Sequence, residues 1–263
     1  MAQRLPDSSQ TAPHIPESVS ALAATQQLGA FSKLYEAAKS STHITRLVVL
    51  ALWVLVGLIG LVLLITGVFT GSMVSVSRFL VFALIIPLFF IIYSIAGIFR
   101  RNYKAYAYTN GFVYSAGSKL SAVIWSQVQE IRHQTFQRND GQKVELSSFI
   151  NNVEELMQIA EGEVTGYLLP QAMQRYTNGN DLLFGSFTIN RKGISRDGQT
   201  LPWQKISTVG YVTKRANTQY SSIRYVGVTT KDGSVWTNAL AMGVPNVQLL
   251  FQVARNILQS TQE

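Results

Sequence analysis

Few residues in this sequence are of types that carry catalytic chemistry, and those few are scattered. Catalysis needs a nucleophile beside a base, a pair of tuned carboxylates, or a metal cluster. The three histidines, His14, His43 and His133, lie far apart, and the chain has no cysteine. It also has no glycine-rich phosphate loop and no Gly-x-Ser-x-Gly turn. We therefore expect no enzyme, no catalytic residue, no metal site and no cofactor; the alternative is an enzyme site assembled from distant residues.

Two pairs of carboxylates are close enough in sequence to be considered for acid–base chemistry. They are Glu154 with Glu155, and Glu161 with Glu163. Both pairs follow the start of a predicted helix, where acidic side chains stabilise the N-terminal end of the helix dipole. We interpret them as helix-capping or solvent-facing residues.

Basic residues are the strongest remaining signal, since the formal net charge is +8. Residues 187–230 contain seven basic residues and a single acid, Asp197. We hypothesise an anionic-lipid contact made by Arg191, Lys192, Arg196 and Lys205, each worth about 1 kcal/mol beside an anionic surface. The alternative is a solvated strand face. Nucleic acid is not expected as a partner, because no nucleic-acid-binding motif accompanies the charge.

The elements that would position these residues occur twice. The stretches "NVEELMQIA" (152–160) and "NVQLLFQVA" (246–254) each predict an amphipathic helix with asparagine as its N-cap. Before each helix the order is a tyrosine- or phenylalanine-containing strand, a turn glycine, a tryptophan, an aliphatic pair and an Asp-Gly turn. Trp125 and Trp203 hold the same place and are assigned to the two cores. The sequence therefore predicts two similar sets of antiparallel strands, each closed by a helix.

Two apolar stretches precede the first repeat. Residues 47–69 and 79–99 contain no charged residue and meet the ~20-residue length needed to cross a bilayer. Basic residues flank the pair on the outer sides, and the positive-inside rule then predicts a two-pass cell-membrane protein with both termini in the cytoplasm. The lack of cysteine fits a reducing compartment.

These observations divide the chain into six segments. We predict a disordered tail (1–27), a juxtamembrane amphipathic helix (28–45), a two-helix transmembrane hairpin (46–100), a first repeat (103–160), a helical linker (161–181) and a second repeat (182–260). Pro170 marks a helix start within the linker.

Several short motifs resemble a known family. They are "LG" at 28–29, "FG" at 184–185, "GI" at 193–194, "LPWQKI" at 201–206 and "PN" at 245–246. This layout is similar to that of a family of uncharacterised membrane proteins, known as a domain of unknown function, with two transmembrane helices and PH-like (pleckstrin-homology-like) cytoplasmic domains. The resemblance implies an α+β fold: an N-terminal transmembrane helical hairpin followed by tandem antiparallel PH-like β domains, each closed by an amphipathic helix. Two features depart from it, because Phe251 replaces the tryptophan of typical terminal helices and the first repeat is short.

The expected function is binding and not catalysis. We expect a membrane-anchored binding or scaffold protein that presents PH-like domains to lipid headgroups or a protein partner. The partners implied are a lipid bilayer, anionic lipid headgroups or a membrane protein, and a homo-oligomer is compatible with the sequence. The alternatives are an accessory subunit of a membrane transport or envelope complex, and an enzyme within the soluble domains.

Overall fold

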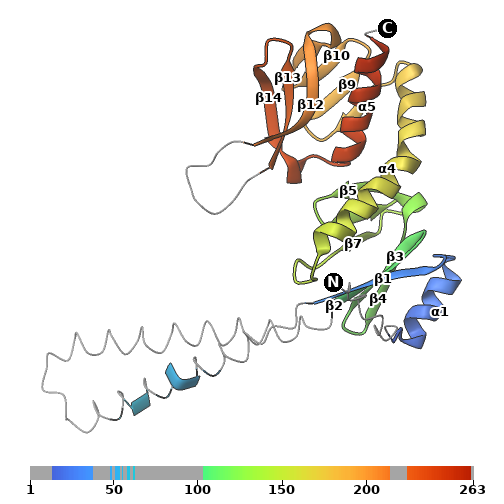
Figure 1. Ribbon diagram of the computed structural model, residues 1–263, viewed down its shortest axis with the longest axis vertical. Helices are drawn as coiled ribbons and strands as arrows, with labels where there is room; N and C mark the ends of the chain where they lie inside the picture. Colours follow the sequence, from blue (N-terminus) through green and yellow to red (C-terminus); the bar gives the residue numbers. More distant parts are fainter. Residues whose placement is uncertain are drawn as a thin grey trace, which may run out of the picture.

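The computed structural model describes residues 14–37, 103–213 and 224–261, together with residues 48, 51–53, 55, 58–59 and 62. Its strands form four antiparallel sheets, two in each of two stacked units (Figure 1). A long helix, α4 (Val153–Thr177), runs from the first unit to the second. A continuous helix therefore connects the two units.

The first unit contains a four-stranded and a three-stranded sheet. The larger sheet has the order β1-β2-β3-β4 and is built from β1 (Phe31–Glu36), β2 (Tyr103–Tyr108), β3 (Gly111–Ala116) and β4 (Lys119–Ile124). A 3-10 turn, η2 (Trp125–Gln127), leads into the smaller sheet of β5 (Val128–Arg132), β6 (Thr135–Arg138) and β7 (Lys143–Glu145). The N-terminal half of α4 closes this unit.

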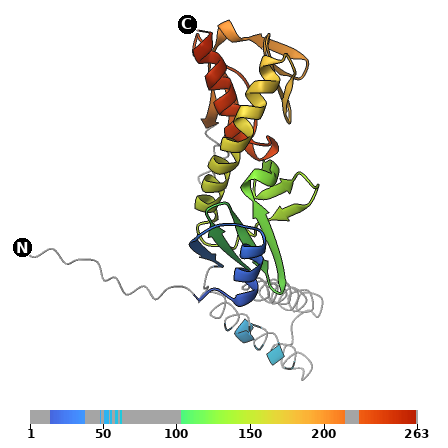
Figure 2. The ribbon, with the colours of Figure 1, turned by 90° about the vertical axis from the view of Figure 1, so that its right-hand side faces the viewer.

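The second unit repeats this order of elements. Its larger sheet contains β8 (Leu182–Phe184), β9 (Phe187–Asn190), β10 (Gly193–Arg196) and β11 (Gln199–Pro202). The turn η3 (Trp203–Lys205) leads into β12 (Ile206–Thr213), β13 (Arg224–Thr230) and β14 (Val235–Leu240). A last turn, η4 (Ala241–Gly243), precedes helix α5 (Val247–Ser260), which closes the unit and contacts α4 (Figure 2).

Each unit has its own apolar core, and α4 contributes to both. In the first unit Leu156 and Ala160 of α4 pack with buried side chains of both sheets. Further along the helix, Ala172 belongs to the core of the second unit. Trp125 and Trp203 are 1% and 4% exposed, which confirms their assignment to the two cores.

A glycine opens the corresponding strand in each unit for the same steric reason. A Cβ at Gly111 would lie 2.1 Å from the carbonyl oxygen of Val123, and a Cβ at Gly193 would lie 2.0 Å from that of Leu201. Both distances are far below van der Waals contact, so the chain can approach its neighbour this closely only at glycine.

The predicted transmembrane hairpin and two-pass topology are corrected by the structure. Most of residues 46–100 lie outside the described residues, and no helix among those described is both long and apolar enough to cross a membrane. Helix α4 has the length, at 25 residues, but carries four glutamates and Arg175. The predicted fold class and the predicted cell-membrane localisation are therefore wrong. Both rest on the hydropathy of residues 47–69 and 79–99, whereas the strands of the described residues form four antiparallel sheets.

The segment predicted as a juxtamembrane helix is also different where it is described. Residues 31–36 form β1, which pairs antiparallel with β2, and residues 38–45 lie outside the described residues. The pairing buries Tyr35 in the first core, so tertiary contacts override the helical spacing of the apolar residues.

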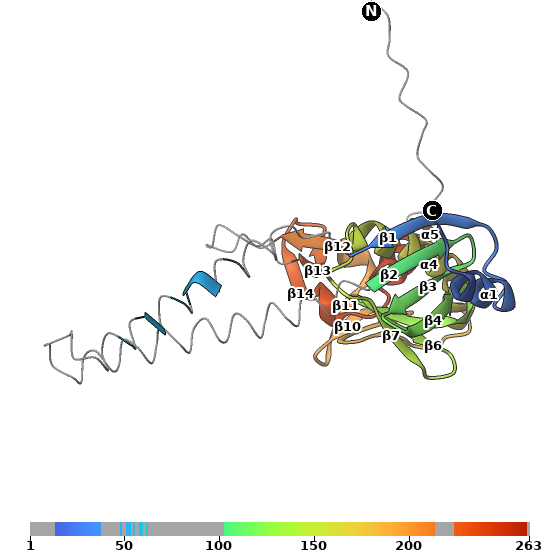
Figure 3. The same ribbon diagram turned by 90° about the horizontal axis from the view of Figure 1, so that it is seen from below.

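The predicted N-terminal tail contains a helix, α1 (Glu17–Thr25), while residues 1–13 lie outside the described residues. Val19 and Ala23 of α1 are buried against the outer face of the first sheet, where the helix contacts β3 and β4 (Figure 3). Apolar burial therefore orders a segment that its polar composition predicted to be disordered.

Two details of α4 and α5 also depart from the sequence-based predictions. Asn152 and Asn246 precede the helices in the left-handed conformation, with φ of 54° and 49°, and neither side chain caps its helix. Pro170 lies inside α4 and does not begin a separate helix.

Candidate functional site

A cleft of about 510 Å³ lies between the two units. One wall is a face of α4 whose residues recur at helical spacing, so their side chains line up along the cleft. The other walls come from the end of β5, from β12 and β13, and from the segment that begins α5. The side chains that carry its chemistry are Glu154, Met157, Glu161, Tyr211, Arg224 and Met242.

Asn246 joins the two units at one end of this cleft. Its backbone N–H donates to the carbonyl oxygen of Ile131 (2.8 Å), and its side-chain Oδ1 accepts from the Ile131 N–H (2.7 Å). Its Nδ2 donates to the carbonyl oxygen of Gln129 at 3.0 Å. Asn246, whose backbone is left-handed, thus satisfies the free edge of β5 with one backbone and two side-chain hydrogen bonds.

The charged groups of the cleft are only partly compensated. Burial raises the pKa of Glu161, and this is opposed by the Gln248 side chain and the charge of Arg224. No ion pair joins Glu161 to a basic residue within the described part of the chain. A half-buried carboxyl group without an ion partner is a group that gains from a ligand with a positive charge.

An aromatic side chain connects the two charges. Tyr211 is 43% exposed in the cleft and packs edge-on against Phe251, with ring centroids 5.0 Å apart. The guanidinium carbon of Arg224 lies 5.8 Å from the Tyr211 ring centre. Burial and the Glu161 charge raise the pKa of Tyr211, so the phenol stays protonated and offers a hydrogen-bond donor.

The histidines do not come together. His133 lines the cleft with a φ of 55°, His14 is exposed, and His43 lies outside the described residues. Nowhere in residues 14–37, 103–213 and 224–261 do three or more metal-ligating side chains cluster.

The two predicted carboxylate pairs are separated by the structure. Glu155 forms an ion pair with Lys33 of β1 at 2.7 Å, which lowers the pKa of Glu155, and it makes no capping box. Glu154 and Glu161 line the cleft, whereas Glu163 is exposed outside it. Sequence spacing along α4 could have indicated that Glu154, Gln158 and Glu161 share one face, but not that this face meets a second unit.

The four predicted lipid-contact residues have different environments. The guanidinium of Arg191 donates to the Thr177 carbonyl oxygen at the end of α4. Arg196 donates to the carbonyl oxygen of Asn238 in β14 and to Thr237 Oγ1 (3.1 Å), so it connects the two sheets of its unit. Lys192 and Lys205 are exposed. Two of the four residues therefore have roles within the fold, and the lipid contact itself stays a prediction.

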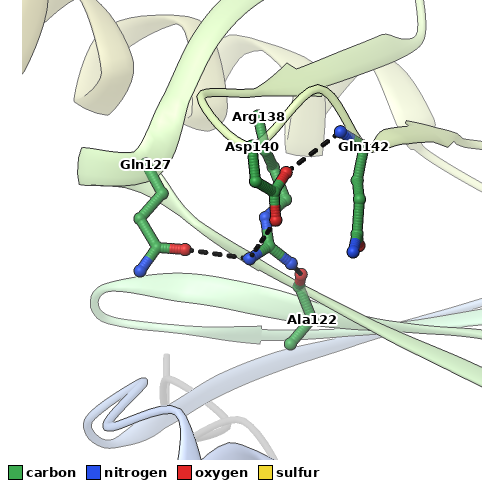
Figure 4. A network of polar contacts seen from close by, with 5 residues as sticks. All are labelled: Ala122, Gln127, Arg138, Asp140 and Gln142. Carbon is green, nitrogen blue, oxygen red and sulfur yellow. Dashed lines mark hydrogen bonds and ion pairs between the residues drawn. The ribbon is translucent and has the colours of Figure 1, made fainter.

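An arginine also connects the sheets of the first unit (Figure 4). Arg138 of β6 donates to the Ala122 carbonyl oxygen of β4 (3.4 Å) and to Gln127 Oε1 (3.2 Å). Asp140 pairs with the guanidinium at 3.0 Å and accepts from the Gln142 N–H at 3.0 Å, which holds the Asp-Gly turn against the arginine. The network joins the two sheets and gives Arg138 a structural role.

The comparisons with known proteins identify a family but no activity. Neither the curated proteins nor the solved structures include a match to this chain. A family model matches residues 11–263, which is nearly the whole chain, and its description is "Family of unknown function (DUF6585)". The resemblance to an uncharacterised domain is thereby confirmed, and the chain belongs to this family of unknown function.

Proposed function

We propose that the protein is a non-catalytic binding or scaffold protein, and that the cleft between its units receives a segment of a partner protein. The observation that carries the proposal is the cleft itself: both units line it, and it places the half-buried Glu161 beside apolar side chains. Ligand sites commonly lie between domains and combine an apolar lining with a few polar groups.

The chemistry of the lining favours a segment that carries a basic side chain next to an apolar one. Glu154 and Glu161 give the α4 wall a negative character within a chain of net charge +8. A lysine or arginine of the partner would supply the ion partner that Glu161 lacks among the described residues. Met157 and Met242 flank the same space, and methionine adapts its shape to varied apolar side chains.

Selection from a random linear peptide library displayed on phage, with the full chain as bait, tests the proposal. The enriched peptides should carry lysine or arginine, and synthetic copies should bind the Glu161→Gln variant at least about tenfold more weakly, as expected for a hydrogen bond to a charged group worth ~1.5 kcal/mol. Glu163→Gln is the matched control, because Glu163 lies on the same helix and outside the cleft.

Binding should also depend on pH with a defined sign. A cationic ligand favours the ionised form of Glu161, so affinity should fall as the pH drops through the raised pKa of that carboxyl group. Failure to enrich any peptide, or equal affinity for wild type and Glu161→Gln, would refute the proposal.

A further inference from the structure

The groove between the smaller sheet and the closing helix exists in both units. In each smaller sheet the register shifts at the same point, between Val128 and Glu130 in β5 and between Ile206 and Thr208 in β12. Counted from these shifts, Val209 holds the position of Ile131. Its N–H and C=O groups consequently face away from β13, as those of Ile131 face away from β6.

The helix faces that border the two grooves also correspond. The α4 side chains in the first groove are Met157, Glu161, Val164 and Thr165. The α5 side chains at the same positions after Asn246 are Phe251, Arg255, Leu258 and Gln259. These four, with Ser207, Thr208 and Val209, line a groove of about 210 Å³ in the second unit.

The two grooves differ in what fills them. In the first, the segment that begins α5 is bound to the strand edge by Asn246, which makes three hydrogen bonds to Ile131 and Gln129. In the second, the edge at Ser207 and Val209 has no hydrogen-bond partner beyond its own sheet within residues 14–37, 103–213 and 224–261. Ser207 is exposed and Val209 half-buried, so the edge is accessible to another chain.

We infer that the groove between β12 and α5 binds a short segment of another protein, in the way that the groove between β5 and α4 binds the Asn246 segment. The internal copy defines the chemistry of the occupant. The backbone N–H of its asparagine donates to the Val209 carbonyl, and the asparagine side chain accepts from the Val209 N–H and donates to the Ser207 carbonyl. This site is separate from the cleft of the proposed function and does not depend on it.

One charge distinguishes the two occupants. In the first groove Gln248, two residues after Asn246, lines the cleft together with Glu161, and its side chain lowers the pKa of that carboxyl group. The corresponding helix residue in the second groove is Arg255, which is exposed. The partner segment therefore carries an acidic residue two positions after its asparagine.

Synthetic peptides that copy the internal occupant test this inference on the full chain. The probe is MGVPNVE, which is residues 242–248 with glutamate in place of Gln248. Titration followed by hydrogen exchange should show protection of the Val209 amide. Replacing the peptide asparagine by alanine should weaken binding at least about tenfold, because two hydrogen bonds are lost.

Two protein variants make the assignment specific. Val209→Pro removes the edge N–H at a position where an edge strand tolerates proline, and should abolish binding. Arg255→Glu should reverse the preference, so that MGVPNVK binds better than MGVPNVE by a few-fold, as for an exposed ion pair.

Three results would each overturn the inference. The first is an affinity that does not change in Val209→Pro, which would place the peptide elsewhere. The second is the absence of binding to the wild-type chain. The third is a dimer of the free chain that depends on Val209, because the groove would then belong to a second copy of the chain.

Discussion

Replacing Asn246 by glycine should weaken the junction between the two units, and a second asparagine provides the matched control. Asn152 and Asn246 both precede a helix in the left-handed conformation. Only Asn246 uses its side chain across the junction, whereas Asn152 is exposed and makes no capping hydrogen bond. Glycine removes the side chain in both variants and relieves the same backbone strain in both, so the difference between them isolates the two side-chain hydrogen bonds.

The magnitude follows from those bonds. The bond from Nδ2 contributes about 1 kcal/mol, and the loss of Oδ1 leaves the N–H of the buried residue Ile131 without an acceptor, which costs ~1–3 kcal/mol. Glycine regains about 1 kcal/mol at positive φ in both variants, so this gain cancels in the difference between them. Asn246→Gly should therefore be less stable than Asn152→Gly by at least about 2 kcal/mol, which corresponds to a Tm difference of at least roughly 4 °C for a chain of this size.

Calorimetry of the two full-length variants measures this difference directly. Hydrogen exchange gives a local check, because the Ile131 amide should lose protection in Asn246→Gly and keep it in Asn152→Gly. Equal Tm values together with unchanged protection at Ile131 would refute the view that Asn246 holds the units together.

Three further predictions concern single positions. Gly193→Ala should lower the free energy of unfolding by about 3 kcal/mol because its Cβ would meet the Leu201 carbonyl, whereas Gly166→Ala, in open space on α4, should raise it by about 1 kcal/mol. Urea unfolding midpoints that shift in the same direction in both variants would contradict this. The stability of the wild type should fall as the pH rises through the raised pKa of Glu161, and Glu161→Gln should remove this fall. Tm values of both proteins recorded from pH 4.5 to 8 measure the difference. Hydrogen bonds from Thr230 and Ser234 lower the pKa of Asp232 from 3.8 to about 2. The stability of the wild type should therefore fall as the pH drops through that range, and the stability of Asp232→Asn should not. Acid unfolding curves that run parallel for the two proteins would contradict this prediction.

The local features of the fold could be predicted from the sequence where one residue type has one physical use. Gly111 and Gly193 mark places where a strand approaches its neighbour too closely for a side chain. Trp125 and Trp203 mark the turn that follows the fourth strand of each unit, and both are buried. Short-range steric and burial requirements are encoded locally, so a single sequence is enough to find them.

Features that depend on distant partners could not be predicted in this way. Residues 31–36 have helical spacing, yet they form β1 because β2, almost seventy positions later, offers an edge to pair with. Asn246 has the sequence signature of an N-cap, but its side chain bonds to β5 of the other unit. The cleft combines residues from 131 to 248, and no local motif marks it.

The duplicated groove explains why the junction between the units and the cleft are coupled. Asn246 lies at the end of the first groove, and the cleft is the part of that groove which the Asn246 segment leaves open. A ligand beside Glu161 therefore contacts the segment that holds the units together, and its binding energy adds to the stability of the junction. By linkage, a change that weakens the junction must also weaken the binding of the ligand. Asn246→Gly should accordingly lower the affinity of a peptide for the cleft although it leaves Glu161 in place, whereas Asn152→Gly should leave that affinity unchanged. An unchanged affinity in both variants would show that the cleft forms without the Asn246 junction.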